Sequence, residues 1–280
     1  MPVGDRALAS PDSVGTDSDR WVALRLIAIR RAYAFASRSP QGAVFSHLTA
    51  AHLHGLPVPH RLFADLSVHV TLGSREARPQ AVGVTAHFVR SGRQRTVALG
   101  GMEVSTAVDT WCELSSMLHL NELVIVGDAL VRRKDPLATM EDLAFRVRAY
   151  SGRHGVRRLR AALELVRPNT DSVPETELRL AIVDAGLPEP EVNVWVVDRQ
   201  GRRLRLGDLV DRKRRILLEY DGPHHFQDEG QRRKDIDVLD AAVADGWRVI
   251  RAHRGHRANG FLEITARLRA ALPERGWPSN

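Results

Sequence analysis

Residues 205–225, RLGDLVDRKRRILLEYDGPHH, contain two apolar runs that end in acidic residues. Asp208 lies in the first run, and Glu219 and Asp221 lie at the end of the second. The near-continuous apolar run before Glu219 is typical of a buried strand, and the two-residue period places Glu219 and Asp221 on one face. If the two runs pair as a hairpin that turns through residues 211–215, Asp208 meets this acidic pair.

Carboxylates at the ends of buried strands are costly to desolvate unless a positive charge compensates them. A divalent cation is the usual compensation, because Mg²⁺ (or Mn²⁺) takes oxygen ligands from carboxylates. The pattern therefore predicts a metal site formed by Asp208, Glu219 and Asp221. Such an ion would neutralise phosphate charge and activate water for attack on a phosphodiester. The alternative is a set of edge-strand carboxylates that pair with nearby arginines.

Two histidines and one glutamate are further candidates for the same site. His224 and His225 follow the second run, and one of them could act as a general acid or base or contact the scissile phosphate. Glu175 begins the preceding predicted helix and could reach the same metal, although Glu177 competes with it for this role. An acidic residue in the first turn of a helix is also stabilised by the helix dipole alone.

The chain has 280 residues, a net charge of +7 and a sequence pI of about 10.4. This charge favours a polyanionic partner, with nucleic acid ahead of an anionic membrane surface. The alternative is an arginine-rich composition without functional meaning. Basic residues are dense around the acidic cluster, and four of them are candidate contacts to a phosphate backbone: Arg203, Arg205, Arg214 and Arg232.

Composition also limits the class of protein. The length suits two domains of ordinary size. The single cysteine, Cys112, excludes an intramolecular disulfide and a cysteine-rich zinc site. No apolar stretch is long enough to span a bilayer, so we expect no membrane partner. Residues 1–19 are polar and lack the apolar segment of a secretory signal, which predicts a disordered tail on a cytoplasmic protein.

Residues 20–166 predict a mainly helical region. One helix is expected over 21–37, and a second within 44–59, VFSHLTAAHLHGLPVP, with Ser46 or Thr49 as its cap. Two short helices joined by a tight turn, followed by a small sheet, match a winged-helix layout. Further helices are expected at residues 106–117, 120–133 and 139–166. Residues 167–174, which contain two prolines, are expected to form a linker.

The remaining part, residues 175–280, has a clear order of predicted elements. A helix is followed by three strands, a second helix and a last strand, and a further helix closes the chain. The fold class is therefore α/β, with an αβββαβ C-terminal core preceded by a winged-helix-like, mainly helical region.

Residues 170–272 resemble a known domain family. The strings ETELR, GRRLRLGDLV, RRILLEYDGPHHF and LDAAVADGWRVIRAH resemble the DUF559 domain, which is similar to the Vsr endonucleases of the PD-(D/E)xK restriction-endonuclease-like group. The resemblance implies an αβββαβ core and Mg²⁺-dependent DNA cleavage. It places Glu175 on the first helix, Asp208 as the metal-binding aspartate, and His225 as the histidine after the DG pair. Glu219 and Asp221 fall in the E-x-K slot, where Asp221 replaces the usual lysine.

Residues 20–135 resemble, more loosely, the AbiEi-type antitoxin family of transcriptional regulators. The segments VFSHLTAAHLHGLPVP, STAVDTWCEL and NELVIVGDALVRR carry the similarity. The resemblance implies a winged helix-turn-helix module that binds DNA, although winged helices also bind proteins. We therefore predict a metal-dependent DNA endonuclease with a DNA- or partner-binding N-terminal module. The alternative is a non-catalytic DNA-binding regulator, or a toxin–antitoxin component, with a degenerate nuclease fold.

Overall fold

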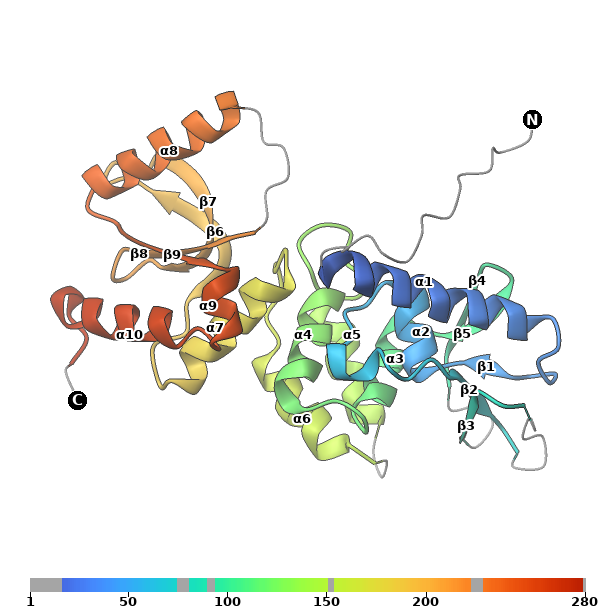
Figure 1. Cartoon of the computed structure of the whole chain (residues 1–280). Coiled ribbons are helices and arrows are strands. Elements are labelled where there is room, and N and C mark those ends of the chain that lie inside the picture. The colour runs from blue at the N-terminus through green and yellow to red at the C-terminus, as the bar shows by residue number, and fades with distance from the viewer. Residues whose placement is uncertain (1–16, 75–80, 90–93, 151–153, 223–228, 279–280) are drawn as a thin grey trace. The chain divides into compact units, whose positions relative to one another are not determined.

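The computed structural model describes residues 17–74, 81–89, 94–150, 154–222 and 229–278 (Figure 1). The side chains of residues 17–19 and 229–235 are not described. The chain divides into two compact units, Met1–Thr106 and Ala107–Asn280. Among the helices of the described ranges, none is both long enough and apolar enough to cross a membrane.

The described part of the first unit contains a mixed five-stranded sheet and two α-helices. Its elements are α1 (Asp17–Ala36), β1 (Val44–Phe45), α2 (His47–His54), the 3-10 helix η1 (His60–Leu62), β2 (Val68–Leu72), β3 (Val84–Phe88), β4 (Thr96–Leu99) and β5 (Met102–Ser105). The strand order is β3-β2-β1-β5-β4. Ala32 and Phe35 of α1 pack with Phe45, Val70 and Val104 of the sheet.

The expected helix-turn-helix takes a different form in the structure. Residues 37–46 join α1 to α2 and contain strand β1 in place of a tight turn. Val44 pairs with Thr71 of β2 and Phe45 with Val104 of β5, so β1 lies at the centre of the sheet. Helix α2 therefore begins only at His47, after Ser46 in the N-cap position. The hairpin of β4 and β5 was not predicted.

Over its described residues, the second unit begins with four helices and continues with the αβββαβ order. Its elements are α3 (Ala107–Leu114), α4 (Leu120–Leu130), α5 (Met140–Ala149), α6 (Val156–Leu165), α7 (Val173–Asp184), β6 (Glu191–Val197), β7 (Arg203–Asp211), β8 (Ile216–Asp221), α8 (Glu229–Ala244), β9 (Arg248–His253), α9 (Arg254–Ala258), α10 (Leu262–Ala271) and the 3-10 helix η2 (Pro273–Arg275). The predicted order of helix, three strands, helix and strand is confirmed from α7 to β9.

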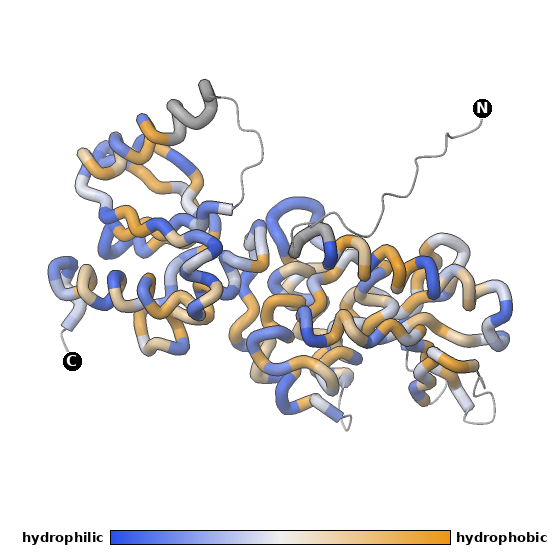
Figure 2. The backbone as a smooth tube through the Cα atoms, viewed as in Figure 1, coloured by the Kyte–Doolittle hydropathy of each residue, from blue (hydrophilic) through white to orange (hydrophobic). Residues whose placement is uncertain are grey.

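The sheet of the second unit has helices on both faces (Figure 1). Its order is β6-β7-β8-β9, with antiparallel pairs except for the parallel pair of β8 and β9, which the α8 crossover connects. Leu209 and Leu218 pack towards α7 and α10, whereas Val210 and Leu217 pack towards α8. Both faces are therefore apolar, and Figure 2 shows the helices with alternating apolar and polar segments, as amphipathic helices have.

A buried ion pair joins helix α4 to helix α7, which precedes the sheet. Asp128 of α4 accepts a hydrogen bond from Nη2 of Arg179 of α7 (2.9 Å), and both side chains are fully buried. Asp128 also accepts from the hydroxyl of Thr176 and from the N–H of Arg167 (both 2.8 Å). The expected linker, residues 167–174, is thus held inside the second unit, and the boundary between the units lies at Thr106 and Ala107.

Candidate active site

Strands β7 and β8 bring Asp208 and Glu219 together. The hairpin pairs Leu209 with Leu218 and Asp211 with Ile216, so the same register, continued by one residue, places Asp208 opposite Glu219. The side chain of Asp208 also bonds to the neighbouring strand, because its Oδ2 accepts a hydrogen bond from the N–H of Tyr220 (2.8 Å). The predicted hairpin and the predicted meeting of these two acidic residues are therefore confirmed.

Gly207 allows the strands to approach closely beside Asp208. A Cβ atom at this position would collide with Cδ1 of Leu217 and would lie 2.9 Å from Cγ2 of Val210. Only glycine leaves room for this contact, which is a common reason for glycine inside a strand. The glycine in LRLGDLV thus leaves room for the side chains of Leu217 and Val210 beside this strand.

Burial and mutual repulsion raise the pKa of both carboxyl groups. The pKa of Glu219 is raised to about 8, mainly by burial and also by the charge of Asp208, while the nearby Arg205 opposes the change. Burial also raises the pKa of Asp208 to about 6, against the hydrogen bond from Tyr220 and together with the charge of Glu175. Two neighbouring carboxyl groups with raised pKa values are typical of functional sites.

Glu219 and Arg205 form an ion pair that is only partly satisfied. Nη2 of Arg205 donates to Oε2 of Glu219 (2.8 Å). Oε1 of Glu219 and Nε of Arg205 are buried and have no hydrogen-bond partner among the described residues. Leaving a buried polar group unpaired costs about 1–3 kcal/mol. An unused carboxylate oxygen next to a second carboxylate suits a hard cation, which takes oxygen ligands.

The acidic pair is smaller than the predicted set of ligands. Within the described ranges, no group of three or more His, Cys, Asp or Glu side chains is placed to hold a metal ion. Asp221 is near enough to raise the pKa of Glu219, but its Oδ1 accepts a hydrogen bond from Nη2 of Arg251 (2.7 Å). Asp208 and Glu219, which the strand register places opposite each other, are the pair that could hold a cation, and Asp221 is held by Arg251.

Glu175 lies close to Asp208 but is held by three donors. Its Oε2 accepts from the N–H of Asp171 (3.0 Å) and from Nδ2 of Asn193 (2.8 Å), and its Oε1 accepts from the hydroxyl of Ser172 (2.8 Å). Ser172 is the N-cap of α7. Glu175 therefore fixes the first turn of α7 to strand β6. Both of its carboxylate oxygens accept hydrogen bonds, and its negative charge raises the pKa of Asp208.

Asn193 is a site residue that the sequence did not identify, and Arg251 is one of the basic residues that the sequence places around the acidic cluster. Asn193 has a positive φ of 48°, which asparagine tolerates better than most residues, and it is a polar residue in the otherwise apolar run VNVWVV. This polar residue within an apolar run is the feature of the sequence that could have identified Asn193 as a site residue. Arg251 lies opposite Glu219 in the parallel pairing of β8 and β9, a register that the sequence does not specify.

The four predicted phosphate contacts have different surroundings. Arg203 is exposed and lies over the ring of Trp195, 5.1 Å from its centre. Arg214 pairs with Asp211 (2.6 Å) at the hairpin turn, so its charge is used within the fold. Arg205 is paired with Glu219, as described above. Arg232 lies on α8 with its side chain outside the described residues, and His224 and His225 lie outside them entirely.

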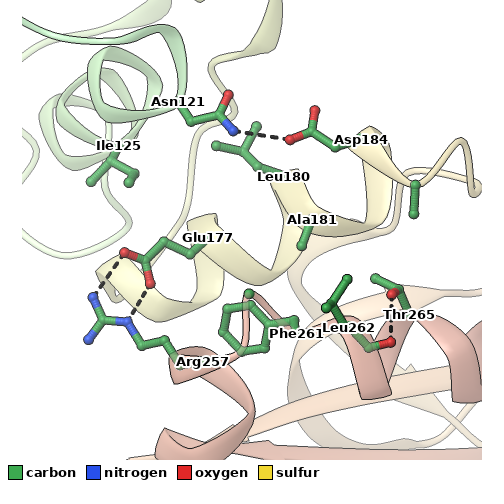
Figure 3. A pocket seen from close by; sticks show the side chains of 12 residues that line it. Asn121, Ile125, Glu177, Leu180, Ala181, Asp184, Arg257, Phe261, Leu262 and Thr265 are labelled. Atoms are coloured by element: carbon green, nitrogen blue, oxygen red, sulfur yellow. Dashed lines mark hydrogen bonds and ion pairs between the residues drawn. The ribbon is translucent and has the colours of Figure 1, made fainter.

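A cavity of the second unit lies away from the acidic pair. It measures about 510 Å³ and opens between α4, α7 and the α9–α10 segment (Figure 3). Its polar side chains are paired with one another: Glu177 binds both Nε and Nη2 of Arg257, and Asn121 donates to Asp184 (3.1 Å). Glu177 is therefore engaged in this cavity wall and does not compete with Glu175 for the acidic site.

The first unit contains a cluster of histidines that the sequence did not single out. Nδ1 of His69 lies 2.9 Å from Nε2 of His87, and Nε2 of His69 lies 3.1 Å from Oδ2 of Asp65. The ring of His47 stacks on His87, with 3.5 Å between ring centres. Burial lowers the pKa of His87 to about 4 and the pKa of His47 well below its usual value. Burial thus favours the neutral form of the His47 and His87 rings.

A comparison of the chain with models of protein families finds no match, and a comparison with curated proteins finds none either. The resemblances to the DUF559 domain and to AbiEi-type antitoxins therefore stay predictions. Any functional assignment depends on the residues themselves.

Proposed function

We propose that the second unit is a metal-dependent DNA endonuclease in which Asp208 and Glu219 hold a divalent cation, Mg²⁺ or Mn²⁺. One observation carries the proposal: a buried carboxyl group, Glu219, and a partly buried one, Asp208, lie side by side with raised pKa values, and Oε1 of Glu219 has no partner among the described residues. The net charge of +7 and the resemblance to the DUF559 domain support DNA as the substrate.

The residues around the pair have distinct roles in this proposal. When bound, the cation would neutralise charge on the scissile phosphate and lower the pKa of a coordinated water. The N–H of Tyr220 holds Asp208 in place, and the apolar strands on either side exclude water, which strengthens electrostatic interactions. Arg205 and Arg251 supply positive charge beside the carboxylates, where the usual lysine is absent. His225 remains the predicted acid, base or phosphate contact.

Nicking of supercoiled plasmid tests the proposal. The wild type is expected to nick the plasmid with Mg²⁺ or Mn²⁺ and not with EDTA. Asp208→Asn should abolish nicking and retain DNA affinity, because it removes a ligand charge without removing a basic residue. Asp211→Asn is the matched control on the same strand, and it should nick like the wild type. Equal nicking by Asp208→Asn and the wild type would exclude Asp208 from the site.

A non-catalytic DNA-binding regulator is the second candidate function. One observation favours it: Glu219 and Asp221 each have an arginine partner, as in a nuclease fold in which ion pairs have replaced the metal. DNA binding without nicking, with no measurable affinity for divalent cations, would support it. A toxin–antitoxin component that acts by protein contact would instead show weak DNA binding with little dependence on salt, because phosphate contacts make affinity fall steeply with salt.

A further inference from the structure

The ion pair of Arg205 and Glu219 has one unused group on each side. Nη2 of Arg205 and Oε2 of Glu219 are joined at 2.8 Å, while Nε of Arg205 and Oε1 of Glu219 are buried without a partner in the part of the chain that the structure describes. The Glu219 side chain is 9% exposed and the Arg205 side chain 22%. The pair therefore keeps one donor and one acceptor away from bulk water, although folding usually satisfies such groups.

The two unused groups fit two different parts of one ligand. A carboxylate oxygen beside Asp208 suits a divalent cation, and a guanidinium N–H suits a phosphate oxygen. A cation bound to a DNA phosphate presents both. The cation and the guanidinium are both positive, however, so they compete for the same carboxylate of Glu219.

We infer that Arg205 is a displaceable counter-ion, which neutralises Glu219 in the cation-free protein and moves to a DNA phosphate when a divalent cation binds Asp208 and Glu219. This inference rests on the proposed function. The arginine side chain suits the movement, because its planar fork of five donors binds carboxylate and phosphate groups equally well. Arg205 would thus contribute to DNA affinity only after the cation is bound.

Arg203 provides the contrast on the same strand. It is exposed, and its guanidinium lies over the ring of Trp195, which is 41% exposed. Its position does not depend on Glu219, so a contact from Arg203 to DNA would be equally available with and without a cation. Arg203→Met is therefore the matched control for Arg205→Met.

The experiment measures the affinity of the full chain for a labelled DNA duplex in EDTA and in Ca²⁺, which is used as a divalent cation for binding without turnover. Arg205→Met should bind like the wild type in EDTA, within about twofold, and about tenfold more weakly in Ca²⁺, as expected for one charge-assisted hydrogen bond. Arg203→Met should bind with the same ratio to the wild type in both conditions. Thermal melting of each variant tests for a folding defect. Arg205→Gln repeats the affinity measurement with a second substitution at the same position.

Calorimetric titration of Ca²⁺ without DNA gives a second readout. At pH 9, where competition from protons is smallest, Arg205→Met should bind Ca²⁺ several-fold more tightly than the wild type, because the competing positive charge is gone. Weaker Ca²⁺ binding would mean that Arg205 organises the site, and equal loss of DNA affinity in EDTA and Ca²⁺ would mean a permanent phosphate contact. Either result overturns the inference and leaves the proposed function standing. A wild type that binds no Ca²⁺, Mg²⁺ or Mn²⁺ overturns both.

Discussion

Replacing Glu219 by glutamine should make the protein more stable at alkaline pH. Glu219 is 7% exposed, and its pKa rises from 4.5 to about 8 in the folded chain. Since this pKa is raised, the contribution of the group to stability is fully present below pH 4.5 and is lost as the pH rises through 8. The difference of about 3.5 units, at ~1.36 kcal/mol per unit, corresponds to at most about 5 kcal/mol.

The coupling of Glu219 to Asp208 divides this effect between two groups, so we expect about 2–4 kcal/mol of it to depend on Glu219 itself. In EDTA, the free energy of unfolding of Glu219→Gln relative to the wild type should increase by this amount between pH 5 and pH 9. Denaturant unfolding followed by tryptophan fluorescence measures the difference, because Trp111, Trp195, Trp247 and Trp277 all lie in the second unit.

The control is Glu191→Gln, which changes a half-exposed glutamate on β6 of the same sheet. Its effect on unfolding should stay within about 0.5 kcal/mol at both pH values, as for most surface substitutions. Parallel stability curves for Glu219→Gln and the wild type from pH 5 to pH 9 would refute the reasoning, because the burial of an ionisable Glu219 would then have no energetic consequence.

Two further predictions concern other buried polar groups. Arg179→Met should destabilise the second unit by about 3–5 kcal/mol, since it leaves the buried carboxylate of Asp128 without its ion-pair partner, and the double variant with Asp128→Leu should recover much of the loss in chemical denaturation. In the first unit, burial lowers the pKa of His52 to about 4, so the unit should lose up to about 3 kcal/mol as the pH falls from 6.5 to 4. In melting curves recorded across this pH range, His52→Gln should lose less stability than the wild type. An equal loss in the two proteins would contradict the prediction.

The core of the candidate site could be predicted from the sequence because it depends on local patterns. The two-residue period and the short basic turn specify the hairpin, and the hairpin brings Asp208 to Glu219. The partners of the carboxylates could not be predicted in the same way. Arg251 reaches Asp221 only because β9 runs parallel to β8 after the α8 crossover, and that register is a tertiary property.

Two errors in the predicted organisation have a common cause. Val44 and Phe45 continue the apolar pattern of the next helix, so the sequence alone does not separate strand β1 from α2. The proline-rich segment 167–174 has the composition of a linker, but Asp128 binds the N–H of Arg167 and holds the segment inside the unit. In both cases contacts between residues distant in the sequence override a local preference.

The stability argument and the functional argument meet at Glu219. A glutamate that is buried beside another carboxyl group, with one oxygen that has no partner among the described residues, weakens the fold at pH values where it ionises. Glutamine would fill the same space without this destabilisation, so a purely structural role does not explain an acidic side chain at this position. The same features, a raised pKa and an oxygen without a partner in the described part of the chain, are the ones that a cation would relieve. The destabilisation predicted for the cation-free protein is therefore also the driving force predicted for cation binding.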